Sequence, residues 1–266
     1  MTIVISFDLD GVLLPDPLED TVFEDLIIRL AQEIAPLQGW SRSQAEEEVR
    51  RRVWEEFHRQ SRAGYYPVEA FDWDAIFIRV SRALGARQAV DIGRMVRELC
   101  QRPHEIPSYP EVPEVLAELR RRGARLLVVT NGYAQYQVPL LYALGLATFF
   151  YRIVTPDKVG YVKPARGIYR HAFAGLDGRK VHVGDYLLHD VYGAHQAGLE
   201  AVWLERCLPV ELDGLSQTAR LASPMVKGAM RIAMIEEGVP PCAPLNVYMP
   251  DYVIRDLWEL PALLFS

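Results

Sequence analysis

Short apolar runs alternate with stretches of helical periodicity along most of this chain. Runs such as residues 3–7 and 125–130, bounded by turn residues, are typical of buried strands. We expect further strands at residues 151–155, 181–183, 201–204 and 252–254. Because strands that alternate with helices form βαβ units, the pattern predicts an α/β fold with a parallel sheet.

A long stretch after the first strand breaks this alternation. Residues 16–107 show no strand pattern, and their periodicity predicts a set of helices. These helices are expected at about residues 22–37, 42–62, 68–84 and 88–100. Ser41 and Gln44 have the spacing of a capping box at the start of the second helix. We therefore predict an α/β domain, residues 1–15 and 108–266, with an inserted helical domain, residues 16–107.

A second segment, residues 206–248, also fits the alternation poorly. It contains a predicted helix at about residues 217–236 and then a proline-rich stretch. We interpret it as a further insertion within the α/β domain. Its methionines, Met225, Met230 and Met234, either contact a partner or a second copy, or cover the protein's own core.

Composition narrows the class of protein. Half of the 266 residues are hydrophobic, which is ordinary for a globular protein, and the net charge of -6 gives no reason to expect nucleic-acid binding. The three cysteines are far apart in sequence, which argues against a disulfide framework or a zinc site. No apolar stretch approaches the roughly 20 residues of a membrane span, and no signal peptide is evident. We expect a cytoplasmic protein without a membrane partner.

Candidate chemistry begins directly after the first predicted strand. Asp8 and Asp10 share a face if the strand stays regular, and Gly11 lets the chain turn beyond them. Adjacent carboxylates repel unless a cation or a shared proton relieves them, and Mg²⁺ prefers carboxylate oxygens. The segment predicts a Mg²⁺ site with a carboxylate nucleophile, and a simple turn rich in Asp and Gly is the alternative.

More polar residues follow the later strands. Residues 130–132, Thr-Asn-Gly, end the second strand, and Lys163 precedes a helix. Asp185 and Asp190 follow the strand at residues 181–183. Because parallel strands place their carboxyl ends at one edge of the sheet, these positions are expected to lie near one another.

Taken in order, these motifs resemble those of the haloacid dehalogenase-like hydrolases. The matching residues are Asp8-Leu9-Asp10-Gly11-Val12, Thr130, Lys163, and Gly184-Asp185 with Asp190. The resemblance covers about residues 1–14, 111–205 and 249–266. It implies a Rossmann-like parallel sheet, with residues 16–107 in the position of the family's helical cap. The motif set is specific for the family and not for a substrate.

The resemblance implies roles for the aspartates. Asp8 would attack phosphorus, and Asp10 would protonate the leaving alcohol and later take a proton from water. The Asp8 carboxylate, the Asp10 backbone carbonyl and Asp185 would bind Mg²⁺. Asp190 would stand behind these ligands and hold a metal-bound water or Lys163.

The resemblance also implies a phosphoryl-binding group. Thr130 and the backbone N–H groups of Asn131 and Gly132 would hold phosphoryl oxygens. Lys163 would offset the negative charge of Asp8 and of the phosphoryl group.

We therefore expect a Mg²⁺-dependent phosphatase that hydrolyses a small phosphorylated metabolite, a nucleotide or a sugar phosphate, through an aspartyl phosphate. A phosphomutase and a non-catalytic binding protein are the alternatives, and a homodimer is left open. By resemblance, a dehalogenase would lack Asp10. A phosphonatase would use a cap lysine, and residues 16–110 contain none.

Within the helical stretch, the loop at residues 62–67 is a candidate for substrate contact, although it could simply pack its own tyrosines. Arg59 and Arg62 are weaker candidates for holding a second anionic group. We place His189 outside the site, as a surface or helix-start residue, and interpret His182 as a core residue.

Overall fold

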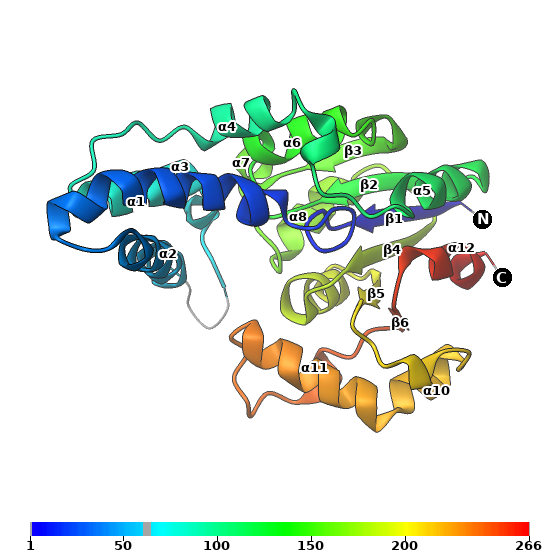
Figure 1. The fold of residues 1–266 in the computed structure, drawn as a ribbon. Helices are drawn as coiled ribbons and strands as arrows, with labels where there is room; N and C mark the ends of the chain where they lie inside the picture. Colours follow the sequence, from blue (N-terminus) through cyan, green and yellow to red (C-terminus); the bar gives the residue numbers. More distant parts are fainter. Residues whose placement is uncertain (1, 61–64, 266) are drawn as a thin grey trace.

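The computed structural model describes residues 2–60 and 65–265, and its framework is one parallel sheet (Figure 1). Six strands lie in the order β3-β2-β1-β4-β5-β6, and every neighbouring pair is parallel. They are β1 (Ile3–Phe7), β2 (Arg125–Val129), β3 (Phe150–Val154), β4 (Arg179–Gly184), β5 (Glu200–Leu204) and β6 (Tyr252–Ile254). The predicted α/β fold is confirmed.

Helices cover both faces of the sheet. Phe7 and Val128 belong to one buried cluster, with residues of α5 (Val112–Arg121), α6 (Ala134–Ala143) and α12 (Leu260–Leu264). Leu127 and Trp203 belong to a second cluster, with residues of α8 (Arg166–Phe173) and α9 (Gly193–Gln196). Because both faces are buried, the strands read as continuous apolar runs in the sequence.

The described residues between β1 and α5 form mainly helices. They are a π-helical turn (Leu18–Phe23), α1 (Glu24–Gln38), α2 (Arg42–His58), α3 (Trp73–Ala83), α4 (Ile92–Leu99), and 3-10 turns at Val68–Phe71 and Pro103–Glu105. Helix α1 packs against α2 and α2 against α3, whereas α4 contacts α6 of the α/β part. Figure 1 shows α1, α2 and α3 beyond the carboxyl end of β1, away from both termini. A separate domain of residues 16–107 stays a prediction.

Polar side chains set where these helices begin. Ser41 and Gln44 form both bonds of the predicted capping box at the start of α2. Asp72 caps α3, and Asp91 caps α4, so both helices begin about four residues later than their apolar pattern predicts. None of the helices within residues 2–60 and 65–265 is long and apolar enough to cross a membrane.

The segment between β5 and β6 contains two helices where the sequence predicted one. Ser223 ends α10 (Gln217–Ala222) and caps α11 (Pro224–Glu236), because Pro224 favours a first helical position and cannot continue the preceding helix. Met230 and Met234 are buried in the cluster that contains α8 and α9. The methionine face therefore covers the protein's own core, with Met225 left exposed.

Short elements complete the chain. They are the helix α7 (Pro156–Val159), a π-helical turn at Leu187–Tyr192, and 3-10 turns at Ala147–Phe149, Val210–Leu212, Leu245–Val247 and Leu257–Glu259.

Candidate active site

A tight turn follows β1 and carries the first two aspartates. The Asp8 N–H donates to the Val183 carbonyl at 2.9 Å, which extends the sheet by one residue. Gly11 then adopts a φ of +77°, and a Cβ there would overlap the Asp185 carboxylate. Glycine is required at this position for both its left-handed backbone and its lack of a side chain.

Arg206, just after β5, secures this turn. Its guanidinium donates to the Gly11 carbonyl at 3.2 Å and to the Val12 carbonyl at 2.9 Å. It also pairs with Glu111 at 2.7 Å. Sequence reasoning missed this residue, because its partners are about 95 to 195 positions away.

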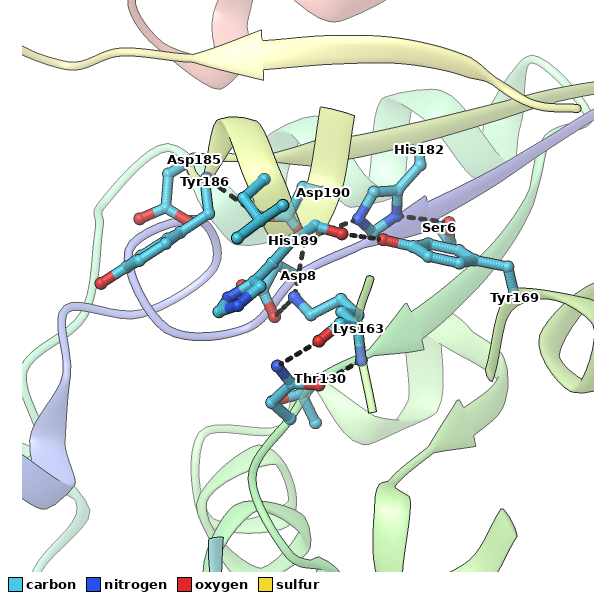
Figure 2. A network of polar contacts seen from close by, with 12 residues as sticks. Ser6, Asp8, Thr130, Lys163, Tyr169, His182, Asp185, Tyr186, His189 and Asp190 are labelled. Carbon is cyan, nitrogen blue, oxygen red and sulfur yellow. Dashed lines mark hydrogen bonds and ion pairs between the residues drawn. The ribbon is translucent and has the colours of Figure 1, made fainter. Parts of the chain in front are cut away.

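Lys163 lies between two carboxylates at the centre of the site (Figure 2). Its Nζ is 2.7 Å from Asp8 Oδ1 and 2.7 Å from Asp190 Oδ1, and the lysine is 2% exposed. Asn131 accepts from the Lys163 N–H at 2.7 Å and donates to its carbonyl at 3.3 Å. Burial alone would lower the pKa of Lys163, but the two carboxylates outweigh burial and raise it, so the side chain is a cation.

Both carboxylate oxygens of Asp190 have hydrogen-bond partners in the protein. Besides Lys163, its Oδ1 lies 2.9 Å from His182 Nε2, and its Oδ2 accepts from the Tyr186 N–H at 3.0 Å. His182 in turn bonds Ser6 Oγ at 2.7 Å (Figure 2). Burial favours a higher pKa for Asp190, yet Lys163 and His182 lower it. His182 is buried as expected, but its contact with Asp190 makes it part of the site's support.

Three carboxylates gather where a cation could bind. One oxygen each from Asp8, Asp185 and Asp190 lies within 4.8 Å of the others. Among the described residues, the buried Oδ1 atoms of Asp185 and Asp10 have no hydrogen-bond partner. Burial, with Asp8 and Asp190 nearby, raises the pKa of Asp185 well above its usual value. Unpartnered buried oxygens and crowded carboxylates are what a hard divalent cation would relieve, so these residues fit one.

Asp10 differs from Asp8 in its surroundings. Its Oδ2 accepts a hydrogen bond from Gln137 Nε2 at 2.6 Å. Burial raises the pKa of Asp10 well above its usual value, and the Asp16 and Asp8 carboxylates raise it further. Burial also raises the pKa of Asp8, to about 6, although Lys163 opposes the rise. Asp10 is therefore the carboxyl group better suited to hold a proton.

The end of β2 contributes the remaining predicted residues. Thr130 continues this strand, and its Oγ1 accepts from the Gly132 N–H at 3.0 Å. A Cβ on Gly132 would overlap Gln137, so glycine is needed here for space. The Asn131 side chain positions Lys163, a role that the sequence did not suggest.

A cavity of about 500 Å³ opens above these groups. Asp8, Asp10 and Lys163 line it, together with aromatic residues of α2 and α3. His189 lies in the π-helical turn at Leu187–Tyr192, near a helix start as expected, and it also lines the cavity, with its ring stacked on Tyr186 at 5.5 Å between centroids. The sequence did not indicate that His189 lines the cavity, because a position near a helix start is equally typical of a surface residue.

The residues predicted to contact the substrate from the loop at residues 62–67 and from Arg59 have different outcomes. Tyr66 lines the cavity, whereas Arg62 lies outside the described residues. Arg59 pairs with Glu56 at 2.8 Å and borders a different hollow. Tyr66 is therefore the described residue of the loop that supports a substrate contact.

The segment between β5 and β6 also reaches the site. Glu237, just after α11, accepts from the Leu187 N–H at 2.7 Å and the Leu188 N–H at 2.5 Å. These two N–H groups begin the turn that runs from Asp185 to Asp190, and Glu237 itself lines the cavity. Glu237 therefore positions the turn that carries both aspartates, which no local sequence pattern indicated.

Replacing Glu237 by glutamine is expected to change how stability depends on pH. Burial raises the pKa of Glu237 to about 8, against the lowering by the two N–H donors. The folded protein then binds this proton more tightly than the unfolded chain, so the glutamate's contribution to stability falls as pH rises from about 4.5 to about 8. Because glutamine does not titrate, the free energy of unfolding of the wild type minus that of Glu237→Gln should fall over that range.

Urea unfolding at about pH 5 and about pH 8.5 measures this difference. Glu211→Gln, at an exposed position outside the cavity lining, is the matched control. A difference that stays constant between the two pH values would contradict the prediction.

Comparison with known proteins agrees with this geometry. A family model described as haloacid dehalogenase-like hydrolase matches residues 4–198. The chain therefore belongs to the haloacid dehalogenase-like hydrolase family. The crystal structure of a HAD phosphatase from Thermococcus onnurineus has a TM-score of 0.66 and 26% identity, and the match covers 99% of this chain and 98% of that one.

Curated relatives match over shorter stretches. Phosphoserine phosphatase of Thermus thermophilus is 40% identical over 108 residues, which is 40% of this chain and 43% of the relative. Glyceraldehyde 3-phosphate phosphatase of Methanothermobacter thermautotrophicus is 34% identical over 119 residues, 41% of this chain and 53% of the relative. The chain thus spans about half the length of the curated relatives that it matches.

Proposed function

We propose that this protein is a phosphoric monoester hydrolase that uses Asp8 as its nucleophile and depends on Mg²⁺. The observation that carries the proposal is the pairing of Lys163 with Asp8 at 2.7 Å in a cavity that Asp10 also lines. Phosphoryl transfer asks mainly for positioning and charge neutralisation, and these residues supply both. The curated relatives described above are phosphatases, which supports the same reaction class.

The first half-reaction uses both aspartates of the β1 turn. An Asp8 carboxylate oxygen attacks phosphorus, so a bond from Asp8 to phosphorus forms while the bond from phosphorus to the alcohol oxygen breaks. Asp10, whose pKa is raised by burial, passes its proton to the departing oxygen, and the neutral alcohol leaves. Lys163 balances the charge that gathers around Asp8.

Water completes the turnover. Asp10, now a carboxylate, takes a proton from a water molecule as its oxygen attacks phosphorus. The bond from phosphorus to Asp8 breaks, inorganic phosphate is released, and the Asp8 carboxylate is restored. Thr130, Asn131 and Gly132 line the cavity where phosphoryl oxygens would lie.

We propose that Asp8, Asp185 and the Asp10 carbonyl hold Mg²⁺, with Asp190 behind them. Asp190 is the least available of the clustered carboxylates, because protein donors already occupy both of its oxygens. When bound, the cation supplies charge stabilisation for the phosphoryl group. We propose a nucleotide or a sugar phosphate as the substrate.

Phosphate release from a panel of phosphate monoesters tests the function. We expect turnover of one chemical class with Mg²⁺, and loss of that turnover with EDTA that excess Mg²⁺ restores. Release of no phosphate from any ester would contradict the proposal. With hexose phosphates, isomerised product without free phosphate would instead favour a phosphomutase.

A further inference from the structure

The part of the cavity away from Lys163 has an unusual lining. It is built from aromatic rings and carboxylates, and among the described residues Lys163 is the one lysine or arginine that borders the cavity as a whole. The aromatic members are Phe23, Trp54, Phe57, Tyr66, Phe71, Trp73 and Tyr186. The acidic members besides Asp8 and Asp10 are Asp16, Glu19, Glu236 and Glu237. These side chains would contact the alcohol part of a bound phosphate ester, so their chemistry affects which esters the cavity accepts.

The aromatic rings form a connected wall. Phe57 stacks on Trp73 with 5.0 Å between centroids and on Tyr66 with 4.5 Å. Trp54 meets Trp73 edge-on at 5.6 Å and is only partly buried, as is Tyr66. His58 bonds the Tyr66 hydroxyl at 3.1 Å. The wall can therefore present flat apolar surface to a ligand without first rearranging.

The charged residues that are described in the lining are mainly acidic. Lys163 is already paired with Asp8 and Asp190, so it has no spare charge for a second anionic group. Glu19 and Glu236 are exposed residues of the cavity lining. Glu19 lies near the β1 turn, and Glu236 lies at the end of α11. Arg51 and Arg52 of α2, and Arg59 directly after it, border a separate hollow and pair with glutamates of α2.

We propose that the site accepts phosphate monoesters whose alcohol carries an apolar or aromatic face and an uncharged or cationic remote group, and discriminates against a second anion. This inference rests on the proposed phosphatase function and narrows its substrate. Among the described lining residues a remote anion would meet mainly carboxylates, whereas a cation would be attracted both by them and by the faces of the rings. A nucleoside monophosphate satisfies the requirement, and a phosphorylated carboxylic acid does not.

Three matched esters test this preference: benzyl phosphate, 4-(aminomethyl)benzyl phosphate and 4-carboxybenzyl phosphate. They share a leaving oxygen and differ in remote charge. We expect kcat/KM for the carboxylate to be at least about tenfold below that of the amine, with the neutral ester between them. A carboxylate ester that is turned over as well as the amine, or better, would overturn the inference.

Binding provides a readout that does not need turnover. The three corresponding benzylphosphonates, titrated by calorimetry in the presence of Mg²⁺, should bind in the same order. If no ester is hydrolysed but the binding order holds, the proposed function fails, whereas the preference for remote charge stands as a property of binding. If the esters are hydrolysed without regard to remote charge, the inference fails and the function stands.

A double substitution assigns the discrimination to the acidic side chains. Glu19→Gln with Glu236→Gln keeps the shape of two exposed residues and removes both charges. We expect the ratio of kcat/KM between amine and carboxylate esters to fall by about threefold or more. Glu211→Gln, exposed and outside the cavity lining, is the control and should leave the ratio unchanged. An unchanged ratio in the double variant would overturn this assignment.

Discussion

Asp8→Asn is expected to reduce phosphate release by at least about a thousandfold while leaving the fold intact. Asparagine has nearly the same shape as aspartate, so it fits the turn after β1. Its amide lacks the negative oxygen that would attack phosphorus, and it cannot form the ion pair with Lys163 that the structure shows at 2.7 Å. Steady-state phosphate release with Mg²⁺, at saturating substrate, measures the loss.

Asp177→Asn is the matched control for this substitution. Asp177 is exposed and borders none of the cavities described above, so the same change of charge there should leave activity unaltered. Circular dichroism and the urea midpoint establish whether each variant is folded. A folded Asp8→Asn variant that releases phosphate at the wild-type rate would show that another group is the nucleophile.

Lys163→Met is expected to destabilise the protein by about 3–5 kcal/mol, because it removes one partner from a buried ionic network. Methionine fills much of the same volume but leaves Asp8 and Asp190 facing each other without a cation. Both aspartates are almost fully shielded from solvent, with 8% and 1% exposure. Activity should also be lost, since the Asp8 carboxylate would be harder to ionise.

The loss in free energy of unfolding caused by Lys163→Met should depend on pH. In the variant, the pKa values of Asp8 and Asp190 are expected to lie above those of the unfolded chain. Protonation then relieves the repulsion, so the variant gains stability as pH falls toward the unfolded values. Wild-type Asp190 has a lowered pKa, so its contribution is lost only at still lower pH, whereas wild-type Asp8, with a pKa of about 6, shows a smaller gain of the same sign. The difference in stability between wild type and variant should therefore narrow between about pH 8 and about pH 5.

Urea unfolding across this pH range tests the prediction. Lys158→Met is the control, because Lys158 is exposed and its pairing with Asp157 at 3.2 Å lies on the surface. A pH-independent cost for Lys163→Met, equal to that of Lys158→Met, would contradict a buried ionic role for Lys163.

Much of the fold could be predicted because its determinants are local. Apolar runs such as residues 125–130 mark strands that are buried on both faces, and the helices between them force parallel pairing. The helix predicted at residues 217–236 was wrong in one respect, because Ser223 and Pro224 divide it into α10 and α11. The Ser223-Pro224 pair is also a local feature, but the apolar periodicity continues on both sides of it and predicted a single helix.

The supporting residues of the site were harder to predict. His182 was expected in the core, and the structure adds that it links Asp190 to Ser6. Gln137 contacts Asp10 from α6, although glutamine near a helix start has no particular sequence meaning. Such contacts depend on how the helices pack on the sheet, which the local sequence does not specify.

The sequence by itself determined the sheet, the strand ends and the motif residues at those ends, since chain topology brings the carboxyl ends of parallel strands to one edge. Tertiary structure alone decided what surrounds them. Glu237 reaches the turn after β4 from about 50 positions away, and the rings of α2 and α3 close one side of the cavity. The physical reason is that motif positions follow from backbone geometry, whereas the cavity's charge and shape follow from long-range side-chain packing.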